Sequence, residues 1–294
     1  MKAIKTEKLC KYYGKERGIT DCSLSVEQGE FFGFIGPNGA GKSTTIRTLL
    51  GLLKKTSGRG EIFGMDIEKE KVKILDCVGY LPSETAFYTG MRVRDLLKLS
   101  ADLRKKDCRA EGERLCERLQ LDISKKVEEL SLGNRKKAGI VCALQHDPAL
   151  LILDEPTSGL DPLMQRAFFD ILRERNQEGA TIFLSSHVLS EIQRNCTRAA
   201  IIREGRVIAC DSVEALARTS AKRVSVHGKV DLSGLDGLRD LKQGEDSTSF
   251  LYSGSMDRLL KVLSAGNVYD LSIAESDLEE IFLHYYTDTE EGKR

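Results

Sequence analysis

FFGFIGPNGAGKSTTIRTLL, residues 31–50, begins as an apolar run, breaks at a glycine-rich segment and continues in a helix-like pattern. The spacing Gly-x-x-x-x-Gly-Lys-Ser ends at Lys42 and Ser43. Glycines reach backbone angles that other residues resist, so consecutive amide N–H groups can turn inward around a polyphosphate. Lys42 adds a positive charge at the outer phosphates, and the Ser43 hydroxyl can bind Mg²⁺ at the positive end of the helix. The stretch therefore predicts strand, loop and helix, and a nucleoside triphosphate site rather than a plain glycine turn.

The composition indicates a globular protein without a strong overall charge. Its 294 residues suffice for one large or two modest domains, and 45 Lys and Arg residues balance 45 Asp and Glu residues. No net field therefore favours nucleic acid or anionic lipid. The eight cysteines include no Cys-x-x-Cys pair, which is typical of small core residues in a reducing cytosol. We expect neither a secretion signal nor a membrane-spanning segment, since about 18 consecutive apolar residues occur nowhere.

The chain on either side of the phosphate loop predicts further strands. Residues 2–28 alternate polar and apolar positions around a turn at Gly14–Gly18, which indicates antiparallel strands. Tyr13 precedes this turn, where its ring could stack on adenine or simply pack on the strand face. After the loop, residues 61–67 (EIFGMDI) predict one strand, which a short helix joins to another at residues 77–82 (CVGYLP).

A helical insert is predicted next, over about residues 84–135. Apolar residues recur there at helical spacing between charged ones, as at Leu115 and Leu119. The insert ends at LSLGN, residues 130–134, directly before a second helix at residues 135–145. A Ser and a Gly at a helix start offer a hydroxyl and free amides to an anion, although taken alone they indicate only an N-cap.

Polar residues follow two apolar strands downstream. LLILDE, residues 150–155, is an apolar strand that ends in Asp154 and Glu155, and a buried strand can place such groups only at its tip. Asp154 can hold Mg²⁺ directly or through water, and Glu155 can polarise a water for attack on the terminal phosphate. A further strand, residues 181–186, ends at His187. Parallel sheets bind ligands at this end, so His187 is predicted to bridge the terminal phosphate and the attacking water rather than to be an ordinary polar residue.

The order of GPNGAGKST, LSLGN, LLILDEPTSGLDP and SSH closely resembles that of the nucleotide-binding subunit of ATP-binding cassette (ABC) transporters. The resemblance covers roughly residues 3–217 and implies an α/β fold: a P-loop NTPase core with a mixed sheet, an antiparallel β subdomain and the helical insert. It implies that Lys42, Glu155 as the base and His187 as the switch histidine are catalytic, and that Ser43 and Asp154 bind Mg²⁺. The ATP-binding residues that it implies are Tyr13 at the adenine, Gly36, Pro37, Asn38, Gly39, Ala40, Gly41, Lys42, Ser43 and Thr44 around the phosphates, and Ser131 and Gly133 from a second subunit.

Two positions depart from the commonest pattern of that family. Ser83 stands where many members carry a Gln that supplies a ligand to Mg²⁺ and the reactive water, so Ser83 would reach the metal only through a water or with help from Glu84. The signature is LSLGN where LSGGQ is commonest, so Leu132 adds bulk. The Ser and the second Gly of that signature are kept, and we therefore expect ATP hydrolysis to survive.

The segment 218–294 predicts a small accessory α+β domain beyond the nucleotide-binding domain of residues 1–217. Its predicted strands are residues 222–230, 249–253 and 268–274, and its predicted helices are residues 256–263 and 276–286, the last opened by a Ser276-x-x-Glu279 capping box. Its position suggests docking, regulation or support of a dimer.

The sequence as a whole predicts an ATPase subunit that acts with partners. The resemblance implies head-to-tail dimerisation with an identical or paired subunit. It also implies that the chain binds a separate integral membrane permease and lies at the cytoplasmic face of the cell membrane as a peripheral subunit. QHDPALLILDEPTSGLDP and the C-terminal extension are most similar to exporter-type cassettes, which implies ATP-driven export. The alternatives are a cassette ATPase that acts on ribosomes or nucleic acid, and a nucleotide-dependent regulator with little turnover. Because the chain shows no second cassette, long coiled-coil insertion or basic surface, no nucleic-acid partner is expected.

Overall fold

The computed structural model describes residues 1–14, 16–218, 222–244 and 246–275. It contains two compact units that divide between Asp211 and Ser212. The division falls slightly before the predicted domain boundary at residue 217, so helix α8 (Val213–Arg218) groups with the second unit. The predicted helix at residues 276–286 lies outside the described residues. Within the described ranges, no helix is both long enough and apolar enough to cross a membrane.

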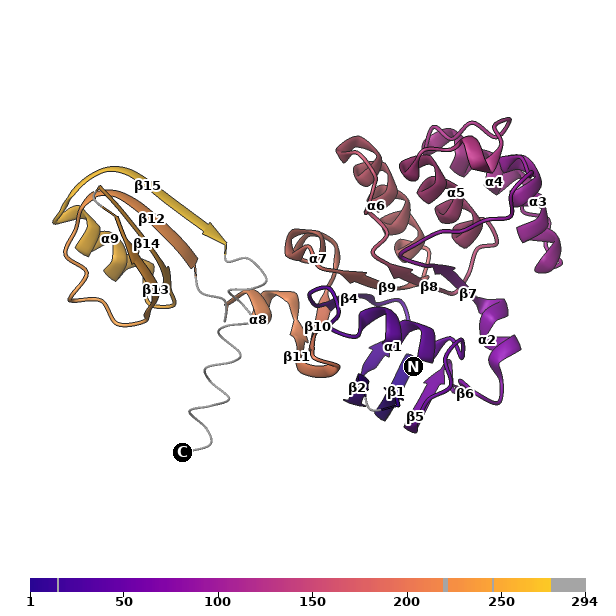
Figure 1. Ribbon diagram of the computed structural model, residues 1–294, viewed down its shortest axis with the longest axis horizontal. Helices are drawn as coiled ribbons and strands as arrows, with labels where there is room; N and C mark the ends of the chain where they lie inside the picture. The colour runs from indigo at the N-terminus through magenta and orange to yellow at the C-terminus, as the bar shows by residue number, and fades with distance from the viewer. Residues whose placement is uncertain (15, 219–221, 245, 276–294) are drawn as a thin grey trace. The chain divides into compact units, whose positions relative to one another are not determined.

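The first unit contains two sheets with helix α1 between them (Figure 1). Its strands are β1 (Lys2–Tyr13), β2 (Glu16–Cys22), β3 (Ser25–Glu27), β4 (Phe31–Ile35), β5 (Ser57–Ile62), β6 (Met65–Asp66), β7 (Val78–Leu81), β8 (Leu150–Asp154), β9 (Thr181–Ser186), β10 (Arg198–Arg203) and β11 (Arg206–Ser212). Its helices are α1 (Lys42–Leu49), α2 (Lys71–Cys77), α3 (Val93–Leu103), α4 (Arg109–Arg118), a 3₁₀ turn η1 (Val127–Glu129), α5 (Leu132–Leu144), α6 (Pro162–Gln177) and α7 (Leu189–Asn195).

The two sheets differ in strand direction. The antiparallel sheet has the order β2-β1-β5-β6, with β3 also paired to β1. The six-stranded sheet has the order β11-β10-β4-β9-β8-β7, and its strands from β10 to β7 run parallel. β11 follows β10 after only the two residues Glu204–Gly205, a connection that antiparallel neighbours alone permit. The sheet is therefore mixed, as predicted.

Helices cover both faces of the six-stranded sheet, which explains its apolar central strands. Every residue of β4, β8 and β9 is buried. Helix α1 contacts β8 as well as β2 and β5, whereas α6 and α7 pack on β9 from the other face (Figure 1). The Phe183 ring of β9 lies 5.8 Å from that of Phe32 and 5.3 Å from that of Phe34, between ring centroids. This shared core fixes β4 and α1, and with them the loop that joins them.

Two predicted elements have different bounds in the structure. Residues 61–67 do not form one strand, because Phe63 (φ 51°) and Gly64 (φ 76°) make a left-handed turn between β5 and β6. The helix expected at residues 135–145 begins earlier, at Leu132, because the Ser131 hydroxyl accepts a hydrogen bond from the backbone N–H of Asn134 (3.3 Å) and caps it.

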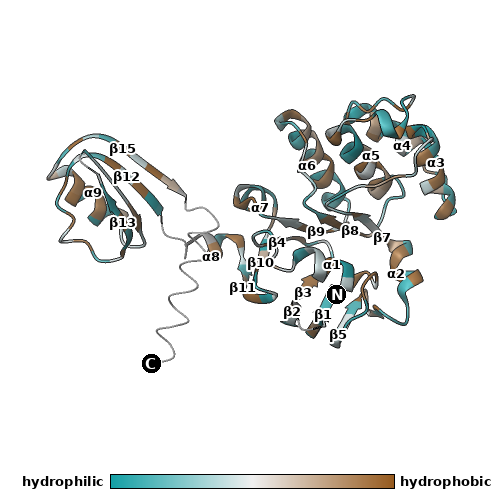
Figure 2. Cartoon of the chain, in the orientation of Figure 1, coloured by the Kyte–Doolittle hydropathy of each residue, from teal (hydrophilic) through white to brown (hydrophobic). Residues whose placement is uncertain are grey.

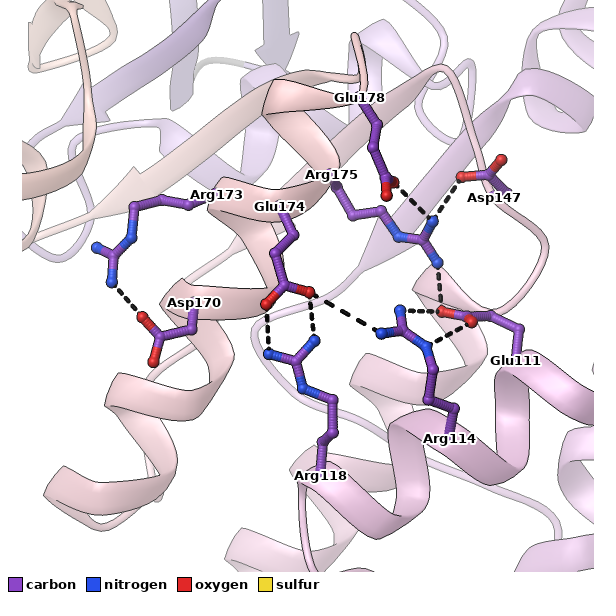
Figure 3. Close-up of polar contacts among 9 residues, drawn as sticks. All are labelled: Glu111, Arg114, Arg118, Asp147, Asp170, Arg173, Glu174, Arg175 and Glu178. Carbon is purple, nitrogen blue, oxygen red and sulfur yellow. Dashed lines mark hydrogen bonds and ion pairs between the residues drawn. The ribbon is translucent and has the colours of Figure 1, made fainter.

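The helical insert packs on itself and is fastened to the core by ion pairs. Helices α3, α4 and α5 contact one another and carry both hydrophobic and hydrophilic stretches (Figure 2). Figure 3 shows a network of arginines and carboxylates between α4 and α6. At its centre Arg175 of α6 is 9% exposed and contacts three carboxylates, those of Glu111, Asp147 and Glu178. A buried arginine is costly unless it is paired, so these contacts hold α4 in one position on α6.

The second unit is a sheet with one helix packed on it. The order is β13-β14-β12-β15, with antiparallel neighbours throughout. Its elements are β12 (Lys222–Lys229), β13 (Leu238–Gln243), β14 (Ser247–Tyr252), α9 (Met256–Ser264) and β15 (Asn267–Glu275). Leu259 and Leu263 of α9 pack with Val224, Val226 and Phe250 in a separate core. The strand β13 was not predicted, because its sequence LRDLKQ is mostly polar and mostly exposed.

A buried histidine makes the stability of the first unit depend on pH. His146 follows α5 and is 2% exposed, and burial together with the charge of Arg104 lowers its pKa from 6.5 to about 4. Between these values the unfolded chain binds the proton and the folded protein does not, so stability falls as the pH falls through this window. We expect this residue to remove about 2 kcal/mol of unfolding free energy between pH 7 and pH 5, measured by urea unfolding.

The matched variant for this measurement is His146→Gln, which removes the titrating group and keeps a polar side chain. Other groups contribute to acid sensitivity, so the difference between the two proteins isolates the histidine. The same loss of stability in wild type and variant would contradict the prediction.

Candidate active site

The phosphate loop leaves the middle of the six-stranded sheet. Its strand, β4, lies between β10 and β9, and α1 begins at Lys42 directly after Gly41. Gly39 (φ 80°) and Gly41 (φ 106°) occupy the left-handed region, which disfavours side chains. At Gly36 an added Cβ would lie 2.5 Å from the carbonyl oxygen of Ile202. The local conformation thus requires glycine at each of these three positions.

The other predicted loop residues lie around this turn. The backbone N–H of Ala40 donates to the carbonyl of Pro37 (3.1 Å), which closes the turn, and Asn38 is exposed. Ser43 and Thr44 are half-buried in the first turn of α1. The Ser43 hydroxyl therefore lies at the N-terminal end of α1, and this end of a helix attracts anions.

Lys42, Glu155 and His187 form one chain of polar contacts. The Lys42 ammonium is 5% exposed and lies 3.0 Å from Oε1 of Glu155. It also donates to the loop carbonyls of Gly36 and Pro37, the latter at 3.2 Å. The other carboxylate oxygen of Glu155 lies 2.7 Å from Nδ1 of His187. The fold therefore brings together three predicted catalytic residues from the start of α1 and the ends of β8 and β9.

Backbone geometry directs Glu155 toward the loop. Strands β8 and β9 pair in parallel with Asp154 opposite Ser185. Glu155 then has φ 49°, and its N–H donates to the Ser185 carbonyl (3.2 Å). A positive φ is uncommon for a residue with a side chain, and here it turns the chain sharply at the end of β8.

Asp154 offers an oxygen that fits a metal ion. The side chain is fully buried, and the Ser185 hydroxyl donates to its Oδ1 (2.6 Å). Its Oδ2 is buried without a hydrogen-bond partner. A buried carboxylate oxygen is costly unless something pairs with it, and Mg²⁺ prefers oxygen ligands. Ser185 was not among the predicted site residues, although a hydroxyl inside the apolar strand TIFLSS was a signal for it.

Ser83 lies beside the same end of the sheet. It follows β7, which pairs in parallel with β8 so that Leu81 is opposite Leu153. The Ser83 carbonyl accepts a hydrogen bond from the Lys136 ammonium (2.8 Å). This contact uses the main chain, and a role of Ser83 at a metal stays a prediction.

Tyr13 lies at the end of β1, close to the start of α1. A Cβ added to Gly18 would lie 2.9 Å from the Tyr13 ring and 3.1 Å from the Thr44 methyl, so these two side chains flank Gly18 together. The ring is exposed, and the Lys11 ammonium lies 5.2 Å from its centroid. An adenine-stacking role for Tyr13 is compatible with this position and stays a prediction.

The signature residues lie on a different element. Ser131 is exposed and caps α5, and Leu132 is 70% exposed. A Cβ added to Gly133 would lie 2.7 Å from the Gly159 carbonyl, so this turn packs on the loop after Glu155. In the described part of the chain, no hydrogen bond joins Ser131 or Gly133 to the phosphate loop.

A glycine phosphate loop with a buried lysine, next to a buried acid and a Glu–His pair on the neighbouring strands, defines a P-loop nucleoside triphosphatase. A family model described as ABC transporter matches residues 19–158. The bacitracin transport ATP-binding protein BcrA of Bacillus licheniformis is 36% identical over 297 residues, which cover 95% of this chain and 96% of that protein. The probable multidrug ABC transporter ATP-binding protein YbhF of Escherichia coli is 32% identical over 223 residues, 74% of this chain and 38% of that protein. The chain belongs to the family of ABC transporter ATP-binding proteins and is a nucleotide-binding ATPase.

Solved structures agree with this assignment. The "Structure of ATP binding subunit of ABC transporter" superposes with a TM-score of 0.69 at 32% identity and covers 74% of this chain and 92% of that chain. The "Dimeric Structure of MJ0796, a Bacterial ABC Transporter Cassette" superposes with a TM-score of 0.66 at 21% identity, covering 71% of this chain and 98% of that one, and shows the likeness of fold. The predicted P-loop NTPase fold and family are confirmed.

Proposed function

We propose that this chain hydrolyses ATP to drive export through a separate membrane permease, as one half of a head-to-tail dimer of nucleotide-binding subunits. The relatives support export, since one is named for bacitracin transport and another as a probable multidrug transporter. We place the chain at the cytoplasmic face of the cell membrane, where a permease would receive it.

The observation that carries the catalytic part is the Glu155 carboxylate shared between Lys42 (3.0 Å) and His187 (2.7 Å). The outer phosphates of ATP carry more negative charge than one carboxylate. Lys42 would therefore bind these phosphates in place of Glu155. Glu155 would then accept the proton of the attacking water, and His187 would orient that water against the terminal phosphate.

Mg²⁺ would be held by the free Oδ2 of Asp154, with the Ser43 hydroxyl and the ATP phosphates as further ligands. Bound there, the ion supplies positive charge against the charge that develops on the phosphates. Ser185 positions Asp154 for this by donating to its other oxygen. Ser83, which follows the neighbouring strand β7, would contribute through a water.

The separation of the signature from the phosphate loop within one chain supports the proposed dimer. Ser131 and the main-chain amides at the start of α5 would form an anion-binding end and contact the terminal phosphate of ATP held by the other subunit. ATP would then join the two subunits, and hydrolysis would release them. Residues 218–294 would form an accessory domain for docking, regulation or support of this dimer.

The experiment that tests the transport role is affinity purification of the full chain from detergent-solubilised membranes of its source cells. We expect an integral membrane protein to co-purify, and the reconstituted pair to hydrolyse ATP several times faster than the chain alone. The Glu155→Gln variant should co-purify the same protein without this turnover. Recovery of ribosomes or nucleic acid in place of a membrane protein would contradict the proposal.

A further inference from the structure

Lys136 is a buried lysine to which none of the roles above gives a function. It lies on α5 and is 3% exposed. Its ammonium donates to the main-chain carbonyls of Ser83 (2.8 Å) and Pro82 (3.3 Å). Lysine is seldom buried to this degree, and when it is, its charge requires partners. Here its hydrogen bonds fix the main chain at Pro82 and Ser83.

That main chain lies beside the catalytic carboxylates. Because Leu81 pairs with Leu153 in parallel strands, Pro82 and Ser83 leave β7 at the level where Asp154 and Glu155 leave β8. Burial lowers the pKa of Lys136 to about 8, whereas the charges of Asp154 and Glu155 raise it. The ammonium is thus within electrostatic reach of both acids.

Helix α5 connects the segment that follows β7 to the signature. The helix begins after Ser131, and Lys136 lies in its second turn. Farther along, a Cβ added to Gly139 would lie 2.7 Å from the methyl of Thr85 and 2.9 Å from Leu81, so α5 packs directly on the segment after β7. Helix α5 therefore carries the signature at its start and also binds the main chain of Pro82 and Ser83, beside the two carboxylates.

We propose that Lys136 is a positioning residue for ATP hydrolysis, which clamps Pro82 and Ser83 to the helix that begins after Ser131. The clamp fixes the main chain next to Asp154 and Glu155, and a shift of the signature end of α5 moves that main chain with it. The inference rests on the proposed role of Glu155 as the catalytic base.

Lys136→Met tests the clamp in the purified full-length chain. Methionine keeps an unbranched apolar stem in the buried position, but the two carbonyls lose their donor. We expect kcat for ATP hydrolysis to fall about tenfold to a hundredfold, while KM for ATP changes less than about threefold, because positioning acts on the reaction more than on binding. Lys136→Arg keeps the donors and the charge and should stay within about fivefold of the wild-type kcat.

Lys106→Met is the matched control. Lys106 is exposed and donates to the main-chain carbonyl of His146 (3.0 Å) beyond the other end of α5, so its loss removes one lysine–carbonyl hydrogen bond away from the carboxylates. It should keep the wild-type kcat, and all three variants should keep melting temperatures close to wild type. A normal kcat in Lys136→Met, or an equal loss in Lys106→Met or Lys136→Arg, would overturn the clamp.

Glu155→Gln, measured alongside, separates the clamp from the proposed base. If kcat falls in Glu155→Gln but is normal in Lys136→Met, the clamp alone is overturned. Normal rates in both overturn the base and the clamp together. Slow rates in both, with normal rates in the control, support the two roles.

Discussion

Lys42→Ala is expected to abolish measurable ATP hydrolysis, with a fall of at least about a hundredfold, and to weaken ATP binding strongly. The ammonium is buried between the loop carbonyls and Glu155, at the place where the outer phosphates of ATP would bind. Phosphate release and isothermal titration with Mg-ATP measure the two effects. The fold should persist, because Glu155 keeps its contact with His187 and alanine leaves the surrounding core of α1 in place.

Lys54→Ala is the control, since it removes an exposed lysine shortly after the same helix. It should bind and hydrolyse ATP as the wild type does. ATP turnover by Lys42→Ala at the wild-type rate would refute the assignment of the phosphate loop.

Lys42→Ala also tests whether each ATP site is shared between two subunits. Ser131→Arg places a bulky charge at the signature and should be inactive alone, as should Lys42→Ala. In a head-to-tail dimer each site takes the loop of one chain and the signature of the other, so a mixed dimer contains one intact site. An equal mixture should therefore recover about a quarter of the wild-type rate if the sites act independently. A rate no higher than that of the separate variants would count against shared sites.

Glu155→Gln is expected to lower kcat by about 10²- to 10⁴-fold while ATP binding persists. Glutamine keeps the shape of the side chain and can still donate toward His187, but it cannot accept the proton of the attacking water. Because the ATP would then stay between the subunits, light scattering should detect a long-lived dimer in Mg-ATP that wild type forms only transiently.

The matched control for this variant is Glu117→Gln, which neutralises an exposed carboxylate on α4. It should leave both kcat and the oligomeric state unchanged. A monomeric Glu155→Gln protein in saturating ATP would argue against the dimer, and a normal rate would show that another group is the base.

Predictions from sequence succeeded where one short segment contains both the structure and its chemistry. The glycine spacing before Lys42 requires left-handed backbone angles and an inward-facing loop, whatever surrounds it, and Gly39 and Gly41 have such angles. An apolar run that ends in Asp154 must bury its middle and present its acids at the tip. The break at Phe63 and Gly64 was missed because a two-residue turn carries little signal inside an otherwise strand-like run.

The sequence by itself determined the phosphate loop, the order of strands and helices around it and the family, because each motif or pattern on which these rest is made of residues close together in the chain. Only the tertiary structure decided which distant groups share one place. Ser185 reaches Asp154 across 31 positions, and Lys136 reaches the Ser83 carbonyl across 53. Such contacts depend on strand register and helix packing, and these are settled by burial of the whole core rather than by any local pattern.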